Sequence, residues 1–311
     1  MSITSRAIIG RFYNRLEIMT SASWVGNISM YFESDQESET YAWLGMAPAM
    51  REWVGGRHAK GFRENTITIQ NKKFEATLEV PVDWMRRDKT GQIQVRIDEM
   101  AGRTVTHWQK LLSQLIANAE SAIGYDGQYF FDTDHSEGLS GSQSNSITVD
   151  ISEQPAKLHG TITAPSTEEI RALVMAGVTA ILGFKDDQGE PMSEMARSFL
   201  VMVPLTWFNI AAAALGSPVI GGDTNTMLTL DGYKFELAIN PRLTWTDKLA
   251  VFRADGSTKP FIRQEEQGVK VSAVAEGSEL EFNEDVHRYG VKALRNVGYG
   301  YWQHACLVRA V

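Results

Sequence analysis

The longest hydrophobic pattern of the chain lies between residues 91 and 123, where apolar residues recur every three or four positions. The stripe consists of Ile97, Ala101, Val105, Trp108, Leu112, Leu115, Ala119 and Ile123. This period predicts one long amphipathic helix, and ~26 residues at 1.5 Å each would span roughly 40 Å. Gly124 supplies a helix stop directly after the stripe.

Residues 65–80 show a different pattern, in which apolar and polar residues alternate. Ile67 and Ile69 precede a polar stretch at 70–73, and a second alternating run follows it at Phe74, Ala76, Leu78 and Val80. Alternation gives each strand one apolar face, so the pattern predicts a two-stranded hairpin. Because a lone hairpin is marginally stable in water, we expect it to pack on its own domain or to reach a neighbouring molecule.

The second half of the chain mixes helix and strand signals. Ser166 and Glu169 form a capping-box pattern ahead of the apolar helix stripe at 170–181. The segment SFLVMVP predicts a buried strand, LTWFNIAAAALG a second helix, and KFELAI and KLAVF two more strands. The order contains no repeat and no series of βαβ units, which predicts an α+β fold.

The first 45 residues lack a clear period beyond one short helix expected at 5–19. They carry several large aromatic residues, among them Phe12, Trp24 and Tyr31. Exposed aromatic residues in such number are an aggregation liability. We therefore expect this segment to be an extended arm that lies on an adjacent molecule, with packing on its own domain as the alternative.

Composition excludes some classes of protein. The 311 residues are 43% hydrophobic and 22% charged, which is ordinary globular composition. The net charge of −8 argues against a broad nucleic-acid-binding face. No apolar run approaches the ~18 residues that a membrane span needs, so we expect neither signal peptide nor anchor. Cys306, the single cysteine, lies in an apolar segment and is interpreted as a buried thiol.

The stretch YDGQYFFDTDHSEG, residues 125–138, raises the question of a metal site. Asp132, Asp134 and His135 could serve as hard-metal ligands or as the acid–base set of a metal-dependent hydrolase. Their spacing matches no complete metal signature. Asp and His side chains also bond the backbone in turns, so we favour a polar turn after the long helix. The motif GGRHAKG at 55–61 lacks the order of a phosphate-binding loop and is interpreted as a flexible base of the hairpin.

Several longer segments together resemble the Mu-like phage major head subunit family. They occur in that family's order along nearly the whole chain: YAWLGMAPAMREWVGGR, NKKFEATLEVPVDWMRRDKTG, YDGQYFFDTDH, FLVMVP, KPFIRQEE and YGVKALRNVGYGYWQHA. The resemblance implies a major capsid protein with the Hong Kong 97-type phage capsid fold. The function that it implies is self-assembly into pentamers and hexamers of an icosahedral shell around double-stranded DNA, without catalysis or cofactor.

The same resemblance implies a division of the chain into five parts. They are an N-terminal arm (1–45), an extended hairpin loop region (46–90), a peripheral domain with the spine helix (91–159), an axial domain (160–265) and C-terminal strands that return to the peripheral domain (266–311). Contacts between subunits are expected at Phe12, Trp24, Tyr31, Lys72, Lys73 and Phe74, with the two lysines at the hairpin tip in ionic contacts.

The partners that the resemblance implies are further copies of the chain, a separate scaffolding protein, a portal, a decoration protein and packaged DNA contacted without sequence specificity. The expected location is the virion, and the host cytoplasm during assembly. Two alternatives remain open at this point. One is the shell protein of an encapsulin-type cellular nanocompartment, which has the same fold, and the other is the metal-dependent hydrolase.

Overall fold

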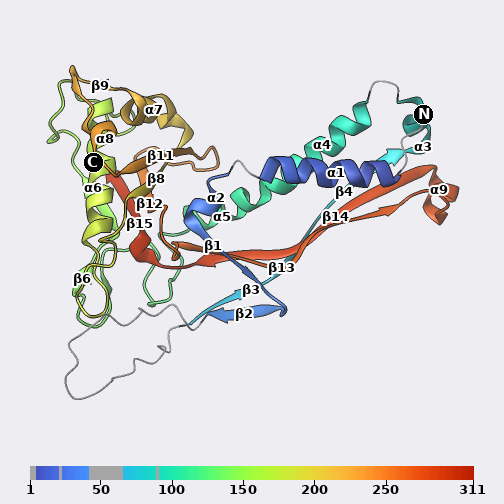
Figure 1. Cartoon of the computed structure of the whole chain (residues 1–311), viewed down its shortest axis with the longest axis horizontal. Helices are drawn as coiled ribbons and strands as arrows, with labels where there is room; N and C mark the ends of the chain where they lie inside the picture. The colour runs from blue at the N-terminus through green and yellow to red at the C-terminus, as the bar shows by residue number, and fades with distance from the viewer. Residues whose placement is uncertain (1–4, 21–22, 42–65, 89–90) are drawn as a thin grey trace, which may run out of the picture.

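The computed structural model describes residues 5–20, 23–41, 66–88 and 91–311. Two lobes lie side by side along the long axis of the molecule (Figure 1). One is elongated and is built on a four-stranded sheet, and the other is built on a five-stranded sheet. A single hydrophobic core continues from the five-stranded sheet into the near end of the elongated lobe, where Leu112, Phe130 and Tyr299 belong to it.

The sheet of the elongated lobe joins the two ends of the sequence. Its strand order is β1 (Ser29–Glu33), β13 (Phe261–Val274), β14 (Val286–Tyr299) and β4 (Lys72–Pro81). β1 runs parallel to β13, and the other two pairs are antiparallel. β13 and β14 have 14 residues each and form the long ribbon of Figure 1. The short helix α9 (Glu279–Glu284) connects them at the far end.

The predicted long helix is present but is divided in two. α4 (Gln92–Val105) and α5 (His107–Ala117) are separated at Thr106. The hydroxyl groups of Thr104 and Thr106 donate to the carbonyl oxygens of Met100 and Arg103. Such back-bonding by threonine bends helices, which accounts for the interruption. The helix also ends earlier than predicted.

The prediction that the helical stripe reaches Ile123 is wrong, because Ile123 lies beyond α5 and is 64% exposed. Residues 118–121 continue only as turns. The hydrophobic period extended past the true end because Ala119, although buried, lies in this turn segment.

The N-terminal helix α1 (Ser5–Thr20) packs along α4 on the helical side of the elongated lobe (Figure 1). Ile8 and Phe12 of α1 are 2% and 1% exposed, and they share a core with Ile97 and Tyr289. The expectation that the arm leaves Phe12 to a neighbouring subunit is therefore wrong for this residue. Its ring already has apolar partners within its own chain, because the stripe of α4 supplies them.

The hairpin predicted at 65–80 is wrong in its pairing. β3 (Ile67–Gln70) pairs antiparallel with β2 (Ser38–Tyr41), whereas β4 pairs with β14. Lys72 and Lys73 therefore lie at the beginning of β4, opposite Arg295 and Leu294, and not at a hairpin tip. The hairpin that does form has β2 and β3 as its strands. Residues 42–65 between them, including the motif at 55–61, lie outside the described residues.

The five-stranded sheet has the order β11 (Lys234–Ile239), β8 (Ser198–Val203), β12 (Lys248–Arg253), β15 (Ala305–Ala310) and β7 (Ser146–Val149). α6 (Thr167–Gly183) packs on β12 and β15, with α7 (Phe208–Gly216) beside it. The capping box predicted at Ser166 and Glu169 is confirmed. At Gly177 the helix approaches closely, since an added Cβ would lie 2.7 Å from Val251 Cγ2.

Residues 266–311, predicted to return to the peripheral domain, divide between the two sheets. β14 lies in the long sheet, but β15 lies inside the five-stranded sheet between β12 and β7. The residues of β15 are almost all buried, Cys306 among them, because both faces of the strand are covered. Burial raises the pKa of the Cys306 thiol, as expected for an inert buried cysteine.

The remaining elements are short and connect the larger ones. They are α2 (Val25–Ile28), α3 (Val82–Arg87), β5 (His135–Ser136), β6 (Ser142–Gln143), η1 (Leu205–Trp207), β9 (Val219–Ile220), β10 (Asp223–Thr224), α8 (Thr226–Thr229) and η2 (Trp302–His304).

Candidate interaction surfaces

The polar loop after the long helix is a buried hydrogen-bonded cluster. His135 is fully buried, and its Nδ1 lies 2.6 Å from Asp126 Oδ2. Its Nε2 lies 3.2 Å from Asn145 Oδ1, and its ring stacks on Trp302 at 4.0 Å between centroids. The amide of Asn145 in turn donates to Phe130 O at 2.8 Å. The cluster ties the loop to η2, so its role in this structure is to hold backbone segments together.

The structure does not bring the three proposed metal ligands together. The carboxylate of Asp132 accepts from the backbone N–H groups of Tyr129 and Thr133. Asp134 is exposed, and His135 faces Asp126 instead. Within the described part of the chain, no group of three or more His, Cys, Asp or Glu residues could hold a metal ion. Sequence reasoning missed Asn145, seven residues beyond the motif, and Trp302, which is distant in the sequence, because neither residue carries a recognisable signal.

The other residues proposed as contacts have separate surroundings. Trp24 packs partly buried against the main core. Tyr31, on the edge strand β1, is 44% exposed, and its hydroxyl donates to Glu265 at 2.8 Å. Burial, followed by that hydrogen bond, raises the pKa of Tyr31 to about 12. Lys72 and Lys73 are exposed, so Tyr31 and the two lysines remain available to a neighbour.

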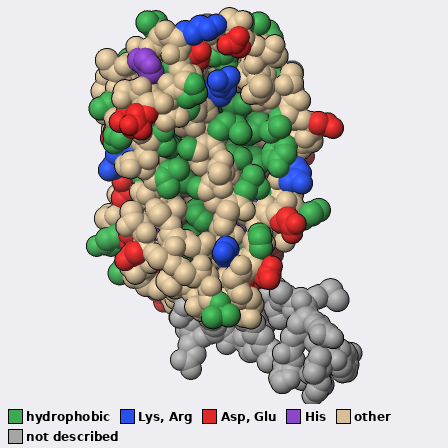
Figure 2. All heavy atoms as spheres, turned by 90° about the vertical axis from the view of Figure 1, so that its left-hand side faces the viewer, with side chains coloured by type: hydrophobic (Ala, Val, Ile, Leu, Met, Phe, Trp, Pro, Cys, Tyr) green, Lys and Arg blue, Asp and Glu red, His purple; other side chains and the backbone are tan. Residues whose placement is uncertain are grey.

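The outer side of α6, facing away from the five-stranded sheet, is poor in charge. We call this surface the α6 face, and its members are half-buried or exposed: Ala172, Met175, Ala176, Thr179 and Ala180. No Asp, Glu, Lys or Arg occurs from 172 to 183, and none occurs in α7. Figure 2 views this side, with hydrophobic side chains gathered in the middle and most charged side chains around them. An apolar patch with a polar rim is typical of a protein–protein contact.

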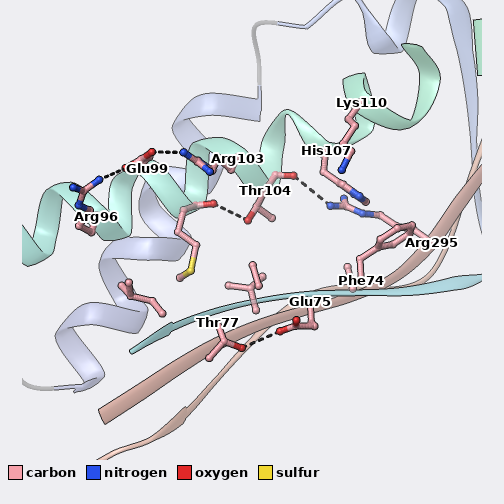
Figure 3. A pocket seen from close by; sticks show the side chains of 15 residues that line it. Phe74, Glu75, Thr77, Arg96, Glu99, Arg103, Thr104, His107, Lys110 and Arg295 are labelled. Atoms are coloured by element: carbon pink, nitrogen blue, oxygen red, sulfur yellow. Dashed lines mark hydrogen bonds and ion pairs between the residues drawn. The ribbon is translucent and has the colours of Figure 1, made fainter. Parts of the chain in front are cut away.

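A second surface is a groove of about 570 Å³ between α4–α5 and the β4 side of the long sheet (Figure 3). Five consecutive residues of β4, 74–78, line it. Because successive side chains of a strand point to opposite faces, such a run means that the strand edge borders the groove. β4 is an edge strand, and among the described strands it pairs with β14 alone.

The helix wall of the groove carries most of its charge. Its lining residues recur at spacings of three and four: Arg96, Glu99, Met100, Arg103, Thr104, His107 and Lys110. At the inner end, the ring of Phe74 contacts His107 at 4.4 Å between centroids (Figure 3). Burial, followed by the charge of Arg295, lowers the pKa of His107 to about 4. His107 is therefore neutral at pH 7.

Solved structures of similar fold come from capsids and related particles. The procapsid protein of bacteriophage JBD30 has a TM-score of 0.57 at 21% identity, covering 99% of this chain and 76% of that one. The capsid protein of cyanophage P-SCSP1u has a TM-score of 0.57 at 10% identity, covering 94% and 88%. A virus-like particle from Pyrococcus furiosus has a TM-score of 0.54 at 9% identity, covering 98% and 99%. The fold is thus that of the Hong Kong 97-type phage capsid proteins.

The sequence assigns the chain more closely. The family model described as Mu-like prophage major head subunit gpT matches residues 5–157 and 247–311, and the chain belongs to this family. Residues 158–246, which hold α6 and α7, lie outside the matched ranges. The family match therefore covers the strands of the elongated lobe and also β7, β12 and β15 of the five-stranded sheet, but not the α6 face.

Two curated relatives agree with the assignment. The Mu-like prophage FluMu major head subunit of Haemophilus influenzae is 25% identical over 283 residues, covering 91% of this chain and 65% of that protein. The major capsid protein of Escherichia phage Mu is 32% identical over 134 residues, covering 42% and 44%. The chain thus spans less than two thirds of either relative. No helix in the described ranges is long and apolar enough to cross a membrane.

Proposed function

We propose that this chain is the major capsid protein of a tailed phage or prophage head, which self-assembles into pentamers and hexamers of an icosahedral shell around double-stranded DNA. The observation that carries the proposal is the membership in the major head subunit family, which covers both ends of the sequence. The fold alone does not separate a phage head from other shells of this fold, since the virus-like particle from Pyrococcus furiosus has a similar TM-score. The family match favours the phage head.

The mechanism is binding between copies, with no reaction catalysed. The α6 face supports this mechanism because burying a charge-poor apolar surface stabilises a complex by about 25 cal/mol per Å² of apolar area removed from water. The interface of a ring-shaped oligomer is heterologous, so each copy needs two different complementary surfaces. The α6 face and the surface of the next copy that covers it would be one such pair.

The partners follow from the same assignment. A separate scaffolding protein, a portal and a decoration protein are proposed. The JBD30 capsid, described as decorated with minor capsid protein trimers, supports the last of these at a TM-score of 0.50. Packaged DNA would meet a protein of net charge −8, which repels DNA mildly, so the contacts with DNA would be weak and without sequence specificity. The site of action is the virion, after assembly in the host cytoplasm.

The test is assembly of the purified chain, followed by sedimentation and negative-stain microscopy. The wild-type chain should form closed particles, alone or with its scaffolding protein. Ala176→Glu places a charge in the α6 face and should reduce particle yield at least tenfold while the circular dichroism spectrum stays unchanged. Ala117→Glu makes the same chemical change at the exposed end of α5 and should assemble normally. Normal particles from Ala176→Glu would remove the α6 face from the mechanism.

A further inference from the structure

The groove of Figure 3 has more positive than negative charge on its helix wall. Arg96 and Arg103 both pair with Glu99, at 2.9 and 2.7 Å. Lys110 makes no ion pair with the described residues, although it lines the same wall. Three cations thus face one carboxylate on an exposed wall, in a protein whose overall charge is −8. Glu75 of β4 is the second carboxylate among the lining residues.

Arg295 adds a fourth cation at the inner end of the groove (Figure 3). Its side chain is only 4% exposed, and its guanidinium lies over the ring of Trp108 at 4.6 Å. Glu265 forms an ion pair with Arg295 at 3.7 Å. The Nε of Arg295 has no hydrogen-bond partner among the described residues. The ion pair with Glu265 offsets part of this charge, so the exposed Arg103 and Lys110 supply most of the attraction for an anionic occupant.

A matching concentration of negative charge lies in the turn between β1 and β2. We call residues 33–39 the acidic turn. It carries Glu33, Asp35, Glu37 and Glu39 and contains no Lys or Arg. None of the four carboxylates forms an ion pair with the described residues, and the first three are exposed. Their charge is therefore available to a partner.

The acidic turn has a fixed shape. The Nδ2 and backbone N of Asn71 donate to Gln36 O and Glu37 O, both at 2.8 Å. Ser34 Oγ donates to Glu39 Oε1 at 2.9 Å. A turn held in this way loses little conformational entropy when it docks. It can therefore act as a rigid acidic projection.

The turn and the groove lie on opposite sides of the long sheet. In Figure 1 the β1–β2 turn projects below β13 and β14, whereas α1 and α4 lie above them. The two charged surfaces therefore cannot meet within one subunit. Between copies they can meet head to tail, and such a heterologous contact closes into a ring when the rotation between copies allows it.

We propose that the acidic turn of one copy docks in the groove between α4–α5 and β4 of the next copy. The contact places Asp35 and Glu37 against Arg103 and Lys110. It rests on the proposed function, because it deepens the account of how copies associate within a ring. It also gives the association a dependence on salt, since exposed charges are screened within about 8–10 Å at physiological ionic strength.

The experiment is a charge swap in the full-length chain. Arg103→Glu with Lys110→Glu reverses the groove, and Asp35→Lys with Glu37→Lys reverses the turn. Each double variant should lower association between subunits at least tenfold at low salt. The chain carrying all four substitutions should recover association, because the reversed turn meets the reversed groove. Arg86→Glu with Arg87→Glu reverses two exposed arginines of α3 outside the groove and should have no effect.

Association is measured in two ways: small oligomers by sedimentation velocity and closed particles by electron microscopy. Particles that form normally from either double variant overturn the docking and leave the proposed function standing. If the double variants do not associate and the chain with all four substitutions does not associate either, the docking is also overturned, because the groove then binds a different acidic partner. Oligomers that follow the charge swap without ever closing into particles support the docking and count against the shell function.

Discussion

Replacing Phe12 by alanine tests whether the N-terminal helix belongs to the fold of its own subunit. The ring is 1% exposed and lies between α4 and the long sheet, in a core with Ile97 and Tyr289. Loss of a fully buried aromatic ring removes about 1.5–3 kcal/mol of transfer free energy. The cavity left behind raises the expected cost of Phe12→Ala to about 3–5 kcal/mol. Ionic contacts of α1, such as Arg11 with Asp98 at 2.7 Å, are too exposed to compensate.

The matched control is Phe282→Ala, because Phe282 is 90% exposed on α9. It should change the free energy of unfolding by no more than about 0.5 kcal/mol. Urea unfolding of unassembled subunits gives the stability, and hydrogen exchange shows whether amides of α1 and α4 lose protection together. If the Phe12→Ala variant is as stable as the Phe282→Ala variant, the burial argument is refuted and Phe12 returns to the set of expected contacts between subunits.

Two further predictions concern buried histidines. Asp134→Ala should change the free energy of unfolding by no more than about 0.5 kcal/mol. His135→Ala removes the partner of Asp126 and should lower the free energy of unfolding, measured with urea, by about 1–3 kcal/mol. Equal effects of the two substitutions would contradict a structural role for the buried cluster around His135. Burial lowers the pKa of His304 to about 3, so the unfolded chain gains a proton below about pH 6.5 that the folded chain does not. The contribution of His304 to stability should therefore fall by up to about 1.4 kcal/mol per pH unit from 6.5 toward 5. His304→Gln should remove this part of the slope and leave the part that His107 contributes.

Local signals in the sequence predicted local structure well. The capping box at Ser166 and Glu169 and the apolar run at 198–203 each depend on residues within a few positions of one another. The polar turn interpretation of 125–138 is supported in the same way, because Asp132 bonds backbone groups one and three residues away. Such interactions need no knowledge of the rest of the fold.

Partners distant in the sequence could not be predicted. The alternation at 67–80 gave the apolar faces of β3 and β4 but not their neighbours, which are Ser38–Tyr41 and Val286–Tyr299. The burial of Phe12 depends on a helix that begins 80 residues later, and the environment of His135 depends on Trp302. Periodicity shows that a side chain needs cover, and tertiary pairing decides what covers it.

The position of β14 and β15 within the two sheets has a consequence for the timing of folding. β14 pairs with residues more than 200 positions earlier, as in the pair Arg295 and Lys72, and β15 separates β12 from β7. Neither sheet can close until the last strands have left the ribosome. Contacts of such long sequence separation also make folding slow, and synthesis proceeds at roughly 5–20 residues per second. A chain still being translated therefore has no finished lobe, and its unpaired strand edges and apolar surface stay exposed until β14 and β15 have emerged.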